Sequence, residues 1–244
     1  MSRVDELTLA ALRTLPPKPD DDAPASIKKR YSEQVSNAVA PAFADELRQR
    51  GMLGARPGPL GGGGPSGAER RMAGAIGAKK VDVTWATEES GLLMALSVKS
   101  INFKDRSTNN YQKNLTNRRG DLLYEGVTLH RRFPYAVLAG FLFLDRGAAE
   151  DGTSQRRSTF LNAHSRLRLF DGRNDPAGRD EQYERLYVVL LDVNPGRAWW
   201  ELYRVGHPTV PLALGDVFDD LVELVGERNP DFYDATEGEL RSAR

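Results

Sequence analysis

The chain of 244 residues contains no cysteine, which excludes disulfide scaffolds, zinc ribbons and thiol nucleophiles. It has three histidines, His130, His164 and His207, and their wide spacing excludes an HExxH pair and a histidine-rich metal centre. Carboxylates and backbone oxygens are then the main ligands that the chain offers to a metal ion. Such ligands favour Mg²⁺ or Mn²⁺ over zinc.

Long hydrophobic runs are scarce as well. The longest, YAVLAGFLFL at residues 135–144, has the length of a buried strand and is too short to cross a bilayer. Residues 1–22 carry acids where a signal peptide has a basic start, and an arginine interrupts the apolar stretch LTLAALRTL. We therefore expect a cytoplasmic protein without a membrane partner.

Neither sign of charge dominates, because 34 lysines and arginines balance 34 acids. Locally the balance shifts: residues 113–132 carry five lysines and arginines against two acids, whereas residues 213–240 carry nine acids against Arg228 alone. The asymmetry predicts a basic face and an acidic face. The alternative is ordinary solvated surface in a chain that prefers arginine.

Residues 1–54 form an N-terminal helical region, with apolar spacing that predicts helices over 5–14 and 25–52 and a break at Pro41. Residues 55–67, ARPGPLGGGGPSG, read as a linker or loop because glycine and proline are too frequent for a helix or strand. Residues 68–244 then form an α/β domain that contains a polar excursion at about 145–185.

The α/β region has a readable order of elements. A helix ending near Gly77 precedes two strands joined by the turn TEESG, and a helix within residues 107–132 leads to the strand at 135–144. Further elements are a short helix within 157–170, strands at 186–193 and 198–206, and a final helix at 214–227. This order predicts a mixed α/β fold around one central sheet.

The two strands VDVTWA and LLMALSVKS each carry one charged residue, Asp82 and Lys99. Alternation places Leu93, Ala95, Ser97 and Lys99 on one side of the second strand, and the hairpin places Asp82 level with Ser97. A carboxylate, a hydroxyl and an ammonium group would then meet at one sheet edge.

A buried charge needs a partner or a metal, so the placement of Asp82 and Lys99 predicts a site. Glu69, on the preceding helix, is a candidate second carboxylate. The alternatives are a purely structural ion pair between the two strands, and a Lys99 side chain that extends from the strand end into solvent.

An acid on a helix, a strand aspartate, a strand that ends in x-Lys and a following helix resemble the core of the PD-(D/E)xK, or restriction-endonuclease-like, nucleases. The resemblance covers about residues 66–144. It implies a mixed sheet flanked by helices and Mg²⁺- or Mn²⁺-dependent hydrolysis of DNA. It also implies that Asp82 and Glu69 hold the metal and that Lys99 assists the attacking water.

Two positions depart from the family pattern. Ser97 stands where the motif has Glu or Asp, and Val81 stands where it has Pro. Some members with Ser-x-Lys recover the missing carboxylate from the next helix. Here Asp121 and Glu125 are the candidates for that role, beside Glu69.

The resemblance also places nucleic-acid contacts on and around the helix after Lys99. The expected contacts are Gln112, Asn114, Arg118, Arg119 and Arg131. The alternative is a solvated helix face with intrahelical ion pairs.

Taken together, these residues predict a DNA endonuclease, with restriction or phage defence as the role by analogy and a homodimer as a plausible form. The competing prediction is a protein on the same fold that binds nucleic acid or a partner without cleaving. Ser97 would then mark a lost catalytic site.

Overall fold

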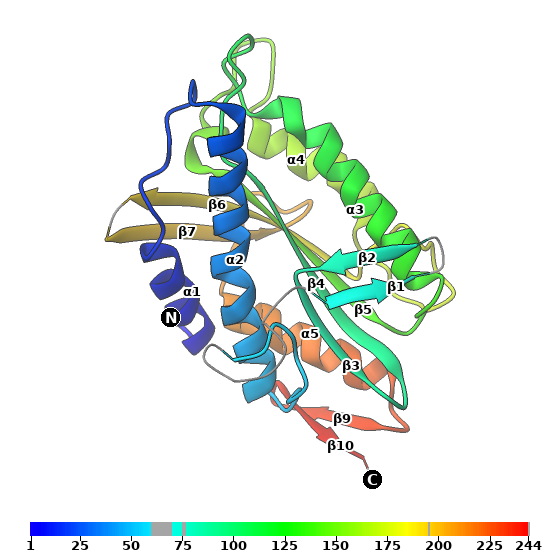
Figure 1. Cartoon of the computed structure of the whole chain (residues 1–244). Helices are drawn as coiled ribbons and strands as arrows, with labels where there is room; N and C mark the ends of the chain where they lie inside the picture. The colour runs from blue at the N-terminus through cyan, green and yellow to red at the C-terminus, as the bar shows by residue number, and fades with distance from the viewer. Residues whose placement is uncertain (60–69, 75–76, 195, 244) are drawn as a thin grey trace.

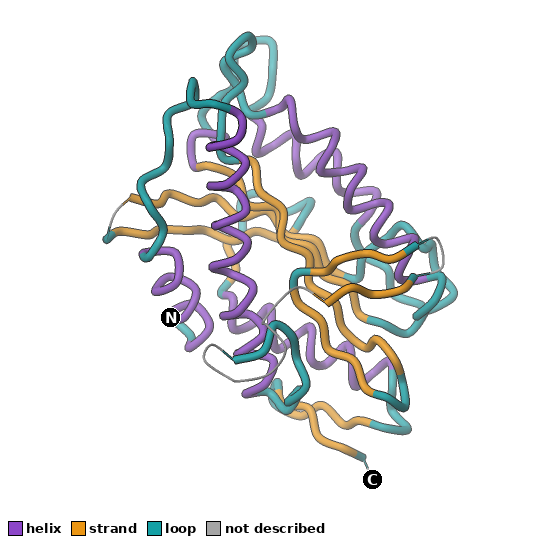
Figure 2. The backbone as a smooth tube through the Cα atoms, in the orientation of Figure 1, coloured by secondary structure: helices purple, strands orange, loops and turns teal. Residues whose placement is uncertain are grey.

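Three layers make up the structure, a computed structural model that describes residues 1–59, 70–74, 77–194 and 196–243. A six-stranded mixed sheet lies in the middle (Figures 1 and 2). Helices α1 (Arg3–Arg13), α2 (Ala25–Gln49) and α5 (Leu214–Arg228) pack on one face. Helices α3 (Leu115–His130) and α4 (Thr159–Leu167) pack on the other. The predicted α/β class, with a central mixed sheet and an N-terminal helical segment, is confirmed.

The sheet has the strand order β3-β4-β5-β6-β7-β8. Its strands are β3 (Val83–Thr87), β4 (Gly91–Ile101), β5 (Val137–Asp145), β6 (Arg185–Asn194), β7 (Arg197–Arg204) and β8 (Pro211–Leu212). Strands β4, β5 and β6 run parallel, and the other neighbours are antiparallel. Short 3₁₀ turns lie at Gln112–Asn114, Arg146–Ala149 and Arg168–Phe170.

The central strands are buried on both faces, which explains their continuous apolar runs. In β5, Phe141 and Phe143 enter the core beneath α2 and α5, whereas Leu138 and Leu142 enter the core beneath α3 and α4. Parallel strands need this double cover because their connections are helices that lie on the sheet. The same alternation puts the side of β4 that carries Lys99 beneath α3.

The alternation expected along β4 is wrong at one end. Trp85 pairs with Met94 but Ala86 pairs with Leu92, so Leu93 is the extra residue of a bulge. Leu93 therefore packs in the opposite core from Ala95. A bulge adds one residue on one strand and shifts the side-chain alternation beyond it.

Helix α2 continues through Pro41, and the predicted break there is wrong. Proline removes one backbone hydrogen bond from a helix interior. Here Val39, Phe43 and Leu47 are fully buried against the sheet on either side of the proline. Burial of that apolar stripe stabilises the helix across the defect.

The helix expected at residues 67–80 is also wrong. The described residues here form an antiparallel pair of strands, β1 (Arg70–Ala73) and β2 (Ala78–Val81). A Cβ on Gly74 would lie 2.2 Å from Thr128 Cγ2, so the hairpin end packs directly against α3. Glu69 itself lies outside the described residues, but the chain after it is a strand.

The chain does not close with helix α5. A second hairpin follows, of β9 (Tyr233–Thr236) and β10 (Glu239–Ser242), joined by Glu237 and Gly238, both with positive φ. Two such residues make the tight turn typical of a two-residue hairpin. In the stretch read as a linker, Ala55 is buried and Arg56 pairs with Thr84, while residues 60–69 lie outside the described residues.

A buried charge cluster joins the layers at the start of β6. Both carboxylate oxygens of Glu184 make ion pairs. Oε1 lies 3.1 Å from Arg173 Nη1 and also 3.1 Å from Arg228 Nη1, and Oε2 lies 3.2 Å from His130 Nε2. Oε2 also accepts a hydrogen bond of 2.7 Å from Leu138 N. Helices α3 and α5 and strands β5 and β6 therefore meet at one carboxylate.

Burial by itself raises the pKa of Glu184, but the hydrogen bonds from His130 and Leu138 and the charge of Arg228 outweigh burial and lower that pKa. A carboxylate with a lowered pKa contributes stability above the unfolded-state pKa of about 4.3. That contribution is lost as the pH falls through the lower, folded-state pKa.

We expect Glu184→Gln to lower the free energy of unfolding at neutral pH by about 3–5 kcal/mol, because it leaves buried arginines without their carboxylate. The matched control is Glu239→Gln, which removes the exposed carboxylate that pairs with Arg241 and should cost less than about 1 kcal/mol. Denaturant unfolding between neutral and acidic pH measures both. A difference between wild type and Glu184→Gln that grows toward low pH would contradict the assignment.

Candidate active site and basic groove

Asp82 lies between β2 and β3, at the edge of the sheet. Its Oδ2 accepts a hydrogen bond of 2.7 Å from the backbone N of Val98, on the neighbouring strand β4. The adjacent pair Val83–Leu96 fixes this register. Asp82 is therefore level with Ser97, as the hairpin predicts.

Lys99 lies between two carboxylates. Its Nζ is 3.5 Å from Asp82 Oδ2 and 3.6 Å from Glu125 Oε2. The side chain of Lys99 is 15% exposed and that of Glu125 is fully buried. The idea that Lys99 simply extends into solvent is therefore wrong.

The charge of Lys99 is set by these neighbours. Burial alone lowers the pKa of Lys99, but the carboxylates of Glu125, Asp82 and Asp121 outweigh burial and raise it above the usual value. Lys99 is consequently a cation at neutral pH. It can stabilise negative charge or orient a water molecule, whereas it is a poor general base.

Ser97 occupies the same face of β4 and is 1% exposed. Its hydroxyl hydrogen-bonds the phenol of Tyr183, whose Oη also lies 3.4 Å from Glu125 Oε1 and 3.1 Å from the carbonyl of Leu122. Burial and the charge of Glu125 raise the pKa of Tyr183 well above its usual value, so this phenol remains a hydrogen-bond donor. Tyr183 thus links Ser97 on β4 to Glu125 on α3.

Of the two candidate carboxylates on α3, the fold brings Glu125 against Lys99. Asp121, one turn earlier on α3, is 45% exposed and pairs with Arg118 at 3.2 Å. Gly126 allows the close approach of α3, since a Cβ there would lie 3.2 Å from the ring of Tyr183. Glu69 lies outside the described residues.

The carboxylates around Lys99 are the candidate ligands for a metal ion at this site. In the described part of the chain no group of three or more acids and histidines is close enough to hold a metal. Asp82 and Glu125 remain as two carboxylates on either side of Lys99. Mg²⁺ is often bound by one or two carboxylates with waters and substrate phosphate completing the octahedron, so two carboxylates fit that ion.

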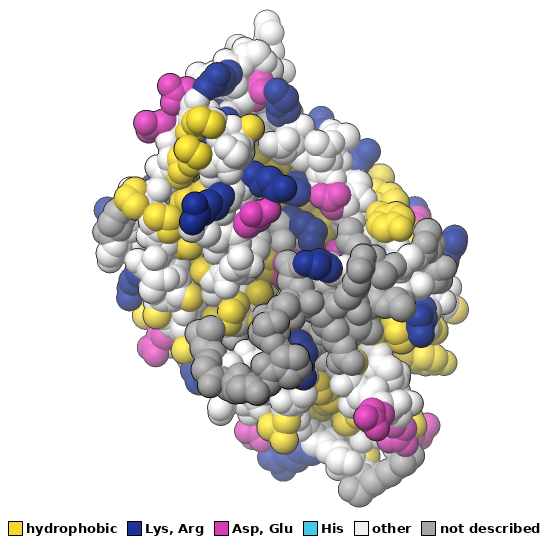
Figure 3. Space-filling view, in the orientation of Figure 1, with side chains coloured by type: hydrophobic (Ala, Val, Ile, Leu, Met, Phe, Trp, Pro, Cys, Tyr) yellow, Lys and Arg dark blue, Asp and Glu magenta, His cyan; other side chains and the backbone are white. Residues whose placement is uncertain are grey.

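A groove of about 1310 Å³ opens from Asp82 and Lys99 between α2 and α3. Among the described residues its cationic lining is Lys28, Lys29, Lys80, Lys99, Lys104, Arg106, Lys113 and Arg118, against the acids Glu33, Asp82 and Asp105. Figure 3 shows lysine and arginine side chains gathered between these two helices. The basic groove, as we call it, has a positive field although the whole chain is neutral.

The expected nucleic-acid contacts divide between groove and surface. Asn114 and Arg118 line the basic groove. The described lining does not include Gln112, Arg119 or Arg131; Gln112 Nε2 lies 3.5 Å from the carbonyl of Arg157, and Arg131 pairs with Asp180 at 3.1 Å.

Several groove and site residues escaped the sequence prediction. Lys28 and Lys29 belong to the run KKR at the start of α2, far in sequence from Lys99, and no local pattern connects the two. Lys104 and Arg106 lie in the loop after β4, where no sequence pattern singled them out. Tyr183 lies at the end of the polar excursion, where no periodicity indicated a buried phenol.

The ion pairs around Lys99 predict strong energetic coupling. In a double-mutant cycle of Lys99→Met and Glu125→Gln we expect a coupling of about 1–3 kcal/mol in the free energy of unfolding, because both charges are buried. The cycle of Arg118→Met and Asp121→Asn, an exposed pair on the same helix, is the control and should give less than about 0.5 kcal/mol. A coupling below about 0.5 kcal/mol between Lys99 and Glu125, as small as in the control, would show that the two side chains do not interact.

Comparisons with known proteins give no relative: no family model, no curated protein and no solved structure matches the chain. Within the described residues, none of the helices has the length and apolar character needed to span a membrane. The chemistry of the site must therefore be argued from its own residues.

Proposed function

We propose that this protein is a metal-dependent nuclease that hydrolyses phosphodiester bonds in DNA, on a restriction-endonuclease-like core. The observation that carries the proposal is the placement of Lys99 between Asp82 and Glu125, where the basic groove begins. A structural ion pair alone would give no reason for this cluster to face a groove rich in lysine and arginine.

The order of elements supports the same assignment. Strands β3 and β4 form the hairpin that brings Asp82 to Lys99, and α3 then crosses to the parallel strand β5. Glu125 on α3 supplies the carboxylate that Ser97 does not, as in members of the family with Ser-x-Lys. Strands β1 and β2 occupy residues 70–73 and 78–81, where a helix was expected to follow from Glu69.

Asp82 and Glu125 would hold Mg²⁺ or Mn²⁺ in this proposal, and the bound ion would polarise a phosphate oxygen and lower the pKa of a water. Lys99 contributes its positive charge to the phosphate at which negative charge develops. Tyr183 fixes the orientation of Glu125 through its hydroxyl. Ser97 has a supporting role in this arrangement, because its hydroxyl faces Tyr183.

The basic groove suits a long polyanion better than a small phosphate ester. Its cations come from several segments, with Lys28 and Lys29 on α2, Lys104 and Arg106 in the loop after β4 and Lys113 before α3. Such lysines and arginines bind backbone phosphates without reading sequence. Asn114 and Arg118 bring the same contacts close to the reacting phosphate.

Restriction or phage defence is the role we assign by analogy with the resembling family. Cutting both strands of a duplex takes two such sites, for which a homodimer is the simplest arrangement. The second candidate function, nucleic-acid binding without cleavage, is favoured by the Lys99 ammonium, which already pairs with both Asp82 and Glu125.

Cleavage of supercoiled and linear DNA in Mg²⁺, Mn²⁺ or EDTA tests the proposal. We expect metal-dependent cutting that falls by about 100-fold or more in each of Asp82→Asn, Lys99→Met and Glu125→Gln, because the first and third remove a carboxylate that would hold the metal and the second removes the cation that acts on the reacting phosphate. The matched control is Glu227→Gln, an exposed acid on α5 across the sheet, which should cut like wild type.

If the folded protein cuts DNA under none of these conditions but still binds DNA in EDTA, the second candidate function, binding without cleavage, replaces the nuclease proposal. Cutting at wild-type rate in both Asp82→Asn and Lys99→Met would reject the site itself.

Binding through the basic groove predicts a salt dependence. In EDTA, Lys29→Gln should lower the slope of log Kd against log salt by about 1, as expected for one lost phosphate contact. The neighbour Arg30 does not line the described groove, so Arg30→Gln is the control and should leave the slope unchanged. Equal slopes for the two variants would place DNA elsewhere on the surface.

A further inference from the structure

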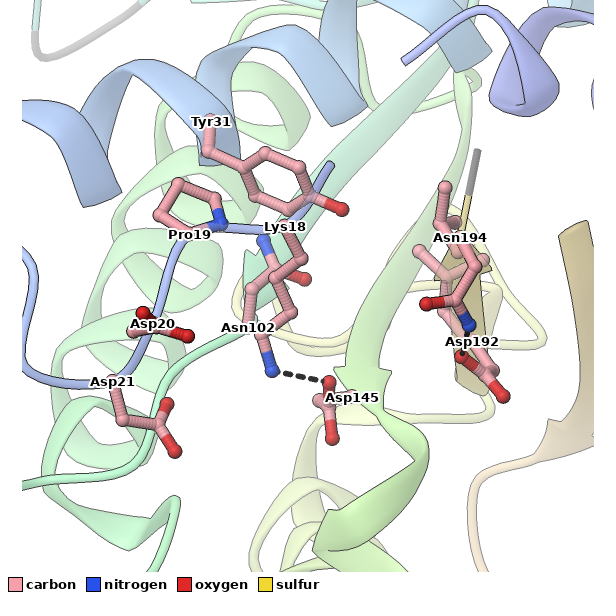
Figure 4. Close-up of a pocket in the computed structure, with 11 residues that line it drawn as sticks. Lys18, Pro19, Asp20, Asp21, Tyr31, Asn102, Asp145, Asp192 and Asn194 are labelled. Carbon is pink, nitrogen blue, oxygen red and sulfur yellow. Dashed lines mark hydrogen bonds and ion pairs between the residues drawn. The ribbon is translucent and has the colours of Figure 1, made fainter. Parts of the chain in front are cut away.

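A second pocket, of about 340 Å³, lies beyond the carboxyl ends of the parallel strands β4, β5 and β6. Asn102 follows β4, Asp145 ends β5, and Asp192 lies near the end of β6. The loop between α1 and α2 closes it from the other side (Figure 4). The carboxyl ends of parallel strands are where ligands of open α/β sheets usually bind.

Carboxylates dominate this pocket. Asp20, Asp21, Asp145 and Asp192 line it, with Lys18 as its cation in the described lining. Lys18 Nζ lies 2.5 Å from Asp145 Oδ2, so the pocket already holds one ammonium group of the chain itself. In the described structure none of the other three carboxylates pairs with a lysine or arginine; Asp21 accepts from the backbone N of Lys104 and Asp192 from the amide of Asn194.

Tyr31 on α2 gives an independent indication of a ligand. Its side chain is buried, with 3% exposed, and its hydroxyl points into the pocket (Figure 4). Within the described residues, this hydroxyl has no hydrogen-bond partner. Burial and the charges of Asp145 and Asp192 raise the pKa of Tyr31 to about 12, so the phenol stays protonated at neutral pH. The ring of Tyr31 is thus buried while its hydroxyl stays free to bond a molecule in the pocket.

We propose that this pocket binds an organic cation, an alkylammonium or guanidinium group. Its N–H groups would donate hydrogen bonds to Asp192, to Asp20 or Asp21 and to the Tyr31 hydroxyl. Its positive charge would offset the negative charge of the carboxylates that lie beside the ion pair of Lys18 and Asp145. The group belongs either to a free amine or to a lysine or arginine side chain of a partner protein.

A metal ion fits less well. The described carboxylates do not gather in a group of three that could hold one. The pocket volume also exceeds that of a bare ion, and the tyrosine hydroxyl is a weak ligand for Mg²⁺ or Ca²⁺. An extended donor with several N–H groups matches acceptors that are spread around the wall.

The pocket borders the basic groove but is separate from the candidate active site. Asn102 lines both, and its Nδ2 donates to Ser100 and Ser32, so its position is fixed. Occupancy of the pocket therefore does not depend on whether the protein cuts DNA. The test needs neither DNA nor metal.

Calorimetric titration of the full chain with 1,4-diaminobutane and with the peptide acetyl-Gly-Arg-Gly-amide tests the proposal. We expect saturable binding of at least one probe. Asp192→Asn should weaken it by about tenfold or more, as for a lost charge-assisted hydrogen bond, and Tyr31→Phe by roughly two- to tenfold. Tighter binding of the diamine indicates a free amine, and tighter binding of the peptide indicates a partner side chain.

The matched control is Asp231→Asn, which removes an exposed aspartate in the turn after α5 and should bind like wild type. Thermal unfolding of each variant verifies its fold. The proposal is wrong if neither probe saturates, if Asp192→Asn and Tyr31→Phe bind like Asp231→Asn, or if Mg²⁺ occupies the pocket more tightly than both probes in an Asp192-dependent way.

Discussion

The ammonium of Lys99, held between Asp82 and Glu125, is the constraint on which the candidate site depends. None of these charges would be tolerated alone at such low exposure, because each loses its hydration on folding. Together they fix the edge strand to β4 and β4 to α3. The same contacts keep Lys99 charged, so the group that stabilises the fold is also the one suited to act on a phosphate.

Glu184 performs a comparable task at the other end of the parallel strands. Arginines from two segments and His130 converge on it, while its second oxygen accepts a hydrogen bond from the start of β5. The two carboxylates differ in what surrounds them. Glu184 is enclosed by positive groups and is structural, whereas the cluster around Lys99 carries two carboxylates for one ammonium and opens to a groove. Excess negative charge at an open site is the condition for recruiting a cation.

Positively and negatively charged side chains gather in two separate but neighbouring hollows, the basic groove and the acidic pocket. Asn102 lies on the border between a groove lined mainly by lysine and arginine and a pocket lined mainly by aspartate. A chain with zero net charge can thus present a strong local field of each sign. If both proposals hold, the basic groove takes phosphates and the acidic pocket an amine or guanidinium, so the two would bind different molecules at neighbouring places.

Local sequence determined the hairpin of β3 and β4, since a turn flanked by alternating residues fixes its own register and therefore brings Asp82 to Lys99. It also determined the buried parallel strands and the crossover helix. Local pattern failed at Pro41, where burial stabilises the helix, and at residues 67–80, where packing against α3 favours a hairpin over a helix. Only the tertiary structure decided that Glu125 faces Lys99, placed Tyr183 beside Glu125 and brought Tyr31, Asp145 and Asp192 around one pocket. Those contacts join segments far apart in the chain, and their geometry follows from how helices pack on the sheet, which no local periodicity encodes.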